Sequence, residues 1–196
     1  MAVPRTNGEN TLALKITSGA VDISEKQIEY LDFLMIHDPD KLAKNHNYLA
    51  KQITVHLDAG RDVAVLNLGD ASLYSSYSYL CRILLKQGYQ VETIPGVTSF
   101  CACAALLNQS LTDVHEPLHI LPASMPDLPS ALALIGGKVL MKSGRALPEV
   151  INLIRREGLN EHSTLVADCG LPSQHIFSNI DKATDEGYFS TILITP

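Results

Sequence analysis

Two short stretches of this sequence carry small polar groups that could bind a bulky polar ligand. Gly69 lets a ligand approach the main chain closely, and Asp70 adds a hydrogen-bond acceptor beside it. Thr98 and Ser99 supply short hydroxyls after the sharp turn that Pro95-Gly96 predicts. Neither stretch is a phosphate cradle, because the sequence contains no GxxxxGK[ST] and no GxGxxG pattern. The chemistry therefore favours an adenosine-like ligand over a nucleoside triphosphate.

Each stretch follows an apolar run of strand length, and a helical pattern separates the two. Residues 63–68 and 91–94 are the predicted strands, and residues 74–86 form the predicted crossover helix. Such a unit brings both loops to the carboxyl edge of one sheet, where open α/β sheets bind ligands. Either loop alone is more often a turn or a helix cap, so the pair is what indicates a site.

These segments resemble the tetrapyrrole methylases, which use S-adenosylmethionine. LNLGDASLYSSYSYL is similar to their Gly-Asp loop, with Ala71 where Pro is commoner, and PGVTSFCACAA is similar to their second cofactor loop. VPRTNGENTLALKI, VLMKSGR and YFSTILI extend the resemblance in collinear order over nearly the whole chain. The resemblance is greatest to the branch that methylates precorrin-2 or cobalt-factor II at carbon 20 in cobalamin biosynthesis.

The resemblance implies an α/β enzyme of two domains with the cofactor in the cleft between them. It assigns the cofactor contacts to Leu68, Gly69, Asp70, Leu73, Thr98, Ser99, Met141 and Ser143. Methyl transfer from a sulfonium is an in-line displacement, so the protein mainly positions the attacking carbon and excludes water. Tyr74 is the candidate for substrate contact, whereas Tyr77 and Tyr79 are expected to pack with their hydroxyls at the rim.

The substrate of such an enzyme is a polycarboxylate, whereas this chain has a net charge of −6. Local cations are therefore needed in the site, because an acidic protein repels an anion. Arg5, Lys15, Lys142 and Arg145 lie within the matching segments and are the candidates. A solvated surface charge remains the alternative for each of them.

Clustered prolines predict a division of the chain into two domains. Pro117, Pro122, Pro126 and Pro129 interrupt a strand-like segment, which predicts a hinge at residues 117–129 between domains 1–116 and 130–196. Periodicity predicts helices at residues 45–59, 100–107 and 147–157, and strands at 138–142, 163–168 and 188–195.

Composition excludes several other classes of protein. No apolar run is long enough to span a membrane and no secretory leader opens the chain, so we expect a cytoplasmic protein. The cysteines form no CxxC pair and the histidines are scattered, so no metal site is expected. No basic stripe points to nucleic acid. The resemblance implies a homodimer.

In the family, the segment that corresponds to Val3 is preceded by a strand, a GxGPGDP-type loop and a helix. The resemblance therefore predicts that one wall of the cleft is missing from this sequence, and we expect cofactor binding with slow methylation. Another tetrapyrrole methylase, or a non-catalytic protein that binds a tetrapyrrole or the cofactor, remains the alternative.

Overall fold

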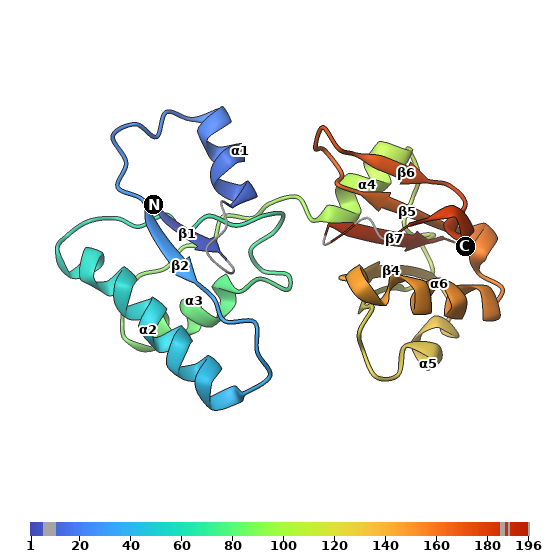
Figure 1. Cartoon of the computed structure of the whole chain (residues 1–196), viewed down its shortest axis with the longest axis horizontal. Coiled ribbons are helices and arrows are strands. Elements are labelled where there is room, and N and C mark those ends of the chain that lie inside the picture. The colour runs from blue at the N-terminus through green and yellow to red at the C-terminus, as the bar shows by residue number, and fades with distance from the viewer. Residues whose placement is uncertain (6–10, 185–186, 188, 196) are drawn as a thin grey trace. The chain divides into compact units, whose positions relative to one another are not determined.

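The structure, a computed structural model, describes residues 1–5, 11–184, 187 and 189–195, without the side chain of Arg145. The chain forms two compact units, Met1–Gly96 and Val97–Pro196. Figure 1 shows the helices and strands of both units. The parts of VPRTNGENTLALKI at residues 6–10 and of YFSTILI at residue 188 lie outside the described residues.

The first unit is built on a small parallel sheet. β1 (Ala2–Arg5) pairs with β2 (Glu29–Asp32). On the other side of β1, the backbone N–H of Ala2 donates to Ala64 O at 2.8 Å, and the N–H of Leu66 donates to Ala2 O at 2.9 Å. Residues 63–68 therefore run beside β1, but they form an isolated parallel bridge at Val65 and not the predicted strand.

The second predicted strand of this unit, residues 91–94, is not a strand in the structure. A strand exists only when a neighbouring backbone supplies its ladder of hydrogen bonds. Among the described residues, no backbone–backbone hydrogen bond reaches this segment. The predicted strand is therefore wrong, because sequence periodicity does not show whether a pairing partner is present.

The helices of the first unit are α1 (Leu12–Ala20), α2 (Pro39–Asp58) and α3 (Tyr77–Lys86). α2 begins where the carboxylate of Asp38 accepts hydrogen bonds from two backbone N–H groups of the first turn, with Pro39 next to it. α3 begins at Tyr77 and not at Tyr74, because Tyr74 has a left-handed φ of 49°. Tyr74 therefore lies before α3, whereas the sequence predicted a helix over residues 74–86.

The second unit contains a mixed five-stranded sheet in the order β3-β4-β7-β5-β6. β3 (Leu118–Pro122) and β4 (Gly137–Met141) are parallel, and the other neighbours are antiparallel. Those other strands are β5 (Ser163–Ala167), β6 (His175–Phe177) and β7 (Ser190–Ile194). The predicted strands near residues 138, 163 and 190 all appear within this sheet.

Helices cover both faces of this sheet. α5 (Leu128–Leu132) and α6 (Leu147–Arg156) pack on one face through a core that includes Leu140, Ile154 and Ile192. α4 (Ser99–Leu107) packs against β7 from the other face (Figure 1). Short 3-10 turns at Gly144–Ala146, Asn160–His162 and Ile180–Lys182 complete the unit.

The division between the units differs from the predicted hinge. Residues 117–129 contain β3 and the start of α5, and both belong to the second unit. β3 is at the edge of its sheet, where one side of the backbone needs no partner, so Pro117 and Pro122 are tolerated at its ends. The prolines therefore mark an edge strand, and the division lies between Gly96 and Val97.

Over the described ranges, none of the helices combines the length and the apolar character that crossing a bilayer requires.

Candidate functional site

The carboxylate of Asp70 joins the two loops of the first unit. Its Oδ1 accepts hydrogen bonds from the N–H of Ser72, at 2.8 Å, and from the Ser72 hydroxyl. Its Oδ2 accepts from the N–H of Gly96 at 2.9 Å. The Ser72 hydroxyl, followed by the N–H groups of Gly96 and Ser72, holds the pKa of Asp70 below its usual value. Asp70 thus ties the Gly-Asp loop to the Pro95-Gly96 turn.

Gly96 is the second part of this junction, although its sequence pattern predicts only a sharp turn. A Cβ at Gly96 would lie 2.2 Å from the carbonyl oxygen of Gly69, a separation that real Cβ atoms do not show. Gly69 itself has a left-handed φ of 67°. The close approach of the two main chains therefore requires glycine at position 96, and the left-handed φ favours glycine at position 69.

Hydrogen bonds of the Ser75 side chain stabilise the rest of the Gly-Asp loop. The Ser75 hydroxyl donates to Asn67 Oδ1 at 2.8 Å and accepts from the N–H of Tyr77 at 3.1 Å. Leu68 and Tyr74 are exposed beside this network. Asn67 and Ser75 were missed in the sequence analysis, because one sequence does not reveal that two polar residues eight positions apart meet.

Two of the predicted cofactor residues of the second unit, Ser99 and Met141, are neighbours of Thr191. Thr191 is paired with Met141 across the β4–β7 ladder, and its hydroxyl donates to the Ser99 hydroxyl at 3.3 Å. Thr191 was not among the predicted residues. Thr191 therefore connects Ser99, at the start of α4, with Met141, at the end of the neighbouring strand β4.

Two hydroxyls of the second unit are buried and lack a partner among the residues that the structure describes. They are Thr98 Oγ1 and Ser143 Oγ, and the Ser143 residue is only 2% exposed. Thr98 precedes α4, yet its side chain makes no helix-capping hydrogen bond. Buried polar groups normally have partners. Both hydroxyls therefore fit residues that bind polar atoms of a ligand, and the helix-cap alternative does not account for Thr98.

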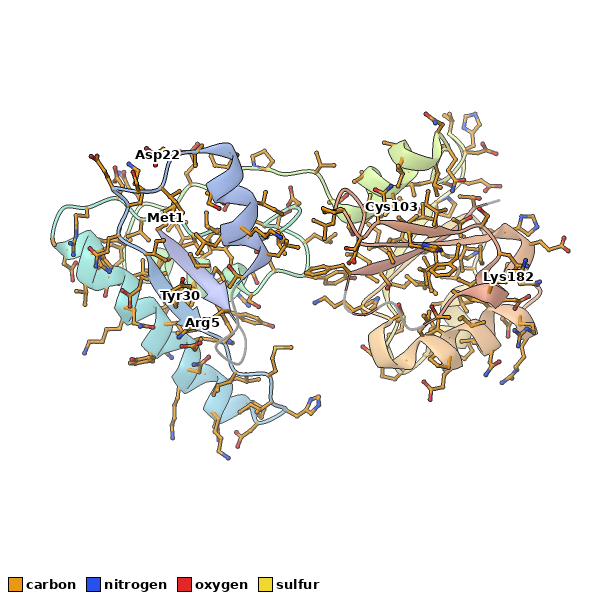
Figure 2. The ribbon with its side chains drawn as sticks, turned by 45° about the horizontal axis from the view of Figure 1, so that its top comes forward. Met1, Arg5, Asp22, Tyr30, Cys103 and Lys182 are labelled. Atoms are coloured by element: carbon orange, nitrogen blue, oxygen red, sulfur yellow. The ribbon has the colours of Figure 1, made fainter. Side chains whose placement is uncertain are left out.

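The predicted cations are divided between the two units, with Arg5 and Lys15 in the first and Lys142 and Arg145 in the second. Arg5 Nε and Nη2 donate to the two carboxylate oxygens of Asp32 at 2.6 and 2.9 Å. Its guanidinium also lies over the Tyr30 ring, 4.5 Å from the centroid (Figure 2). Lys15 is exposed on α1, Lys142 is exposed with a φ of 60°, and the Arg145 side chain is not described. A ligand carboxylate at Arg5 would have to compete with Asp32.

The two cysteines of α4 differ in their exposure to solvent. Cys101 is exposed, whereas Cys103 is fully buried, and Figure 2 labels its position. Burial, followed by the neighbouring Cys169, raises the pKa of the Cys103 thiol to about 12. Across the described residues, histidine, cysteine and carboxylate side chains form no group that could hold a metal ion.

Known proteins are similar to this chain in sequence. The chain is 34% identical over 152 residues to a precorrin-2 C(20)-methyltransferase from Sinorhizobium sp, which covers 76% of this chain and 62% of that protein. It is 28% identical over 192 residues to a cobalt-precorrin-2 C(20)-methyltransferase from Salmonella typhimurium, covering 95% and 80% of the two proteins. The chain thus spans 62% of the length of the first of these relatives.

A solved structure shows the same fold. Uroporphyrin-III C-methyl transferase from Thermus thermophilus, in complex with S-adenyl homocysteine, aligns with a TM-score of 0.68 at 17% identity, over 98% of this chain and 84% of that chain. At this identity the likeness concerns the fold, and it confirms the predicted α/β class. The family model described as Tetrapyrrole (Corrin/Porphyrin) Methylases matches residues 9–183. The chain therefore belongs to the tetrapyrrole methylases, as its motifs predicted.

Proposed function

We propose that this chain takes part in the S-adenosylmethionine-dependent C-methylation of a tetrapyrrole in cobalamin biosynthesis. Precorrin-2 or its cobalt form is the proposed substrate and carbon 20 the proposed position, because the two relatives described above carry those names. The observation that carries the proposal is the Asp70–Gly96 hydrogen bond, which joins the two loops that the resemblance assigns to the cofactor.

In this proposal each predicted residue contributes binding or position. S-adenosylmethionine, when bound, supplies a methyl group on a sulfonium. The main chain at Gly69 and the buried hydroxyls of Thr98 and Ser143 would form hydrogen bonds with its polar groups. The remaining proposed contacts are apolar or neighbouring groups: Leu68, Leu73, Ser99 and Met141.

The chain would promote the reaction by orienting the attacking carbon of the tetrapyrrole toward the methyl group. The tetrapyrrole carbon attacks the methyl group, its new C–C bond replaces the C–S bond, and the carbon then loses a proton. Orienting the two reactants and excluding water account for most of the rate in such a displacement. Tyr74, exposed beside the Gly-Asp loop, is the proposed substrate contact. Arg5, Lys15, Lys142 and Arg145 remain the proposed partners of the substrate carboxylates.

Two measurements test the proposed function. Calorimetry with S-adenosylhomocysteine should show binding to the folded chain. Incubation with S-adenosylmethionine and precorrin-2, followed by mass spectrometry, should show addition of one methyl group. Methylation of a different tetrapyrrole would show that the proposed reaction is right and the proposed substrate is wrong. Cofactor binding without any methylation would indicate a non-catalytic binding protein. Absence of both cofactor binding and methylation would refute the proposal.

A homodimer in the cytoplasm is proposed as the state in which the chain acts. Family membership supports the dimer, and light scattering that gives a monomer over a wide range of concentrations would contradict it. Cell fractionation tests the compartment.

A further inference from the structure

A cavity of about 270 Å³ lies in the first unit, directly beside the Gly-Asp loop. Its lining includes Ala71, Ser72, Tyr77, Ser78, Arg82 and Thr93. Pockets that enclose a ligand of drug size usually hold about 300–1,000 Å³. This cavity is therefore too small for a whole tetrapyrrole, but it suits one side arm of a larger molecule.

The wall and rim of the cavity differ in chemistry. Tyr77 forms the wall, with its ring buried and its hydroxyl bound to the Thr93 hydroxyl at 3.1 Å. Burial raises the pKa of Tyr77, so this hydroxyl stays neutral. The Ser72 hydroxyl is held by Asp70, and the Ser78 hydroxyl donates to the Ser75 carbonyl at 2.9 Å. The wall is thus neutral, and the positive group of the cavity is Arg82.

Arg82 is positioned without being neutralised. Its Nε donates to the Ser78 carbonyl at 3.2 Å, and its guanidinium carbon lies 5.2 Å from the centre of the Tyr79 ring. In the described part of the chain, no carboxylate forms an ion pair with Arg82. Arg5 differs, because Asp32 occupies its fork. A guanidinium fork matches both oxygens of a carboxylate and binds it more strongly than a neutral donor would.

We propose that this cavity binds one carboxylate arm of the tetrapyrrole substrate, with Arg82 as its ionic partner. The inference rests on the proposed function, because it takes a polycarboxylate as the ligand. The chain has a net charge of −6 and would repel a polycarboxylate, so it needs a local positive charge in the site. Arg82, which has no carboxylate partner among the described residues, provides this charge beside the Gly-Asp loop. Arg82 was not among the cations that the sequence analysis selected.

The test uses uroporphyrin I, a porphyrin with carboxylate arms, as the probe, and measures its binding to the full chain by fluorescence. Arg82→Gln should weaken binding by about tenfold, because a charge-assisted pair is lost, and tenfold corresponds to about 1.4 kcal/mol. Arg82→Lys should retain part of the affinity, since the charge remains without the fork. Arg61→Gln is the matched control. Arg61 is an exposed arginine of the same unit that is bonded to Gln27 and does not line this cavity.

Binding of S-adenosylhomocysteine, measured by calorimetry on the same samples, separates the two proposals. If wild type and all variants bind it equally while only the Arg82 variants lose porphyrin affinity, the inference holds. If Arg82→Gln binds the porphyrin as tightly as Arg61→Gln does, the inference is overturned and the proposed function stands. A wild-type chain that binds S-adenosylhomocysteine but no porphyrin also overturns it. A chain that binds neither refutes the proposed function as well.

Discussion

Asp70 holds two loops of the first unit together through both oxygens of its carboxylate. Both of its carboxylate oxygens accept hydrogen bonds from the protein, from Ser72 on one side and Gly96 on the other. The resemblance assigned Asp70 to the cofactor, whereas its contacts in the structure are those of a residue that positions two loops. The main chain of Gly69 is then the group in this loop that is best placed to meet a ligand.

The close approach at Gly96 leads to the first prediction. Gly96→Ala should abolish most binding of S-adenosylhomocysteine, because the new Cβ would lie 2.2 Å from the Gly69 carbonyl oxygen and push the loops apart. Gly19→Ala is the control, since nothing lies within 4 Å of a Cβ there. That change should stabilise α1 by up to about 1 kcal/mol, as alanine is the better helix former. If calorimetry shows that both variants bind S-adenosylhomocysteine equally well, the contact between the two loops is not needed for cofactor binding.

His46 gives a prediction that depends on pH. Its ring stacks on Tyr79 with a centroid distance of 4.4 Å and an interplanar angle of 13°. Burial, and then the charge of Arg82, lowers the pKa of His46 below its usual 6.5. The unfolded chain therefore takes up this proton first as the pH falls. This group's contribution to stability is present above pH 6.5 and is lost as the pH falls from there through the folded pKa.

The measurement for His46 is an NMR titration of its ring protons. In the wild type the apparent pKa should lie below 6.5, and Arg82→Gln should raise it part of the way back. Burial remains in that variant, so full recovery is not expected. Arg61→Gln should leave the titration unchanged, because Arg61 is not among the causes of the shift. An unchanged pKa in Arg82→Gln would show that the two side chains do not interact.

At the scale of helices and strands, the sequence correctly predicted the elements that local sequence patterns determine. The helices predicted at residues 45–59, 100–107 and 147–157 correspond to α2, α4 and α6, although α2 begins earlier, at Pro39. The strands of the second unit also follow from periodicity and turn residues. Residues 91–94 and the prolines at 117–129 were interpreted wrongly, because strand pairing and edge position depend on distant backbone. Likewise, Gly96 and Thr191 acquire roles only through residues far along the chain, and Asn67 acquires one through Ser75, eight positions away.

The start of α4 leads to a prediction at this scale. Thr98→Val keeps the shape of the side chain and removes a buried hydroxyl that has no partner among the described residues. Leaving such a group unsatisfied costs about 1–3 kcal/mol, so the variant should be as stable as wild type or more stable in urea unfolding. It should nevertheless bind S-adenosylhomocysteine several-fold more weakly. Ser99→Ala is the comparison, because that hydroxyl already bonds to Thr191.

A loss of stability in Thr98→Val would indicate that its hydroxyl is satisfied within the protein. Unchanged affinity would remove Thr98 from the proposed cofactor contacts. Gain of stability together with loss of affinity is the combination that a ligand-binding hydroxyl predicts, since a purely structural hydroxyl would change both in the same direction.

At the scale of the whole molecule, each unit has a hydrophobic core of its own. One core draws only on residues of Met1–Gly96, with Leu80 completely buried in it. The other draws only on residues of Val97–Pro196, with Ile154 completely buried in it. Stability in each unit should therefore depend mainly on its own core, because a cavity is felt by the side chains that line it.

Hydrogen exchange followed by mass spectrometry tests this independence. Leu80→Ala and Ile154→Ala should each cost about 2–5 kcal/mol, as typical buried aliphatic truncations do. Leu80→Ala should accelerate exchange in α2 and α3, and Ile154→Ala should accelerate it in α6 and the five-stranded sheet. Val114→Ala, at a side chain that is 94% exposed, should change neither unit. Faster exchange throughout the chain in either core variant would show that the two units unfold together, and the cofactor residues of both would then share a single stability.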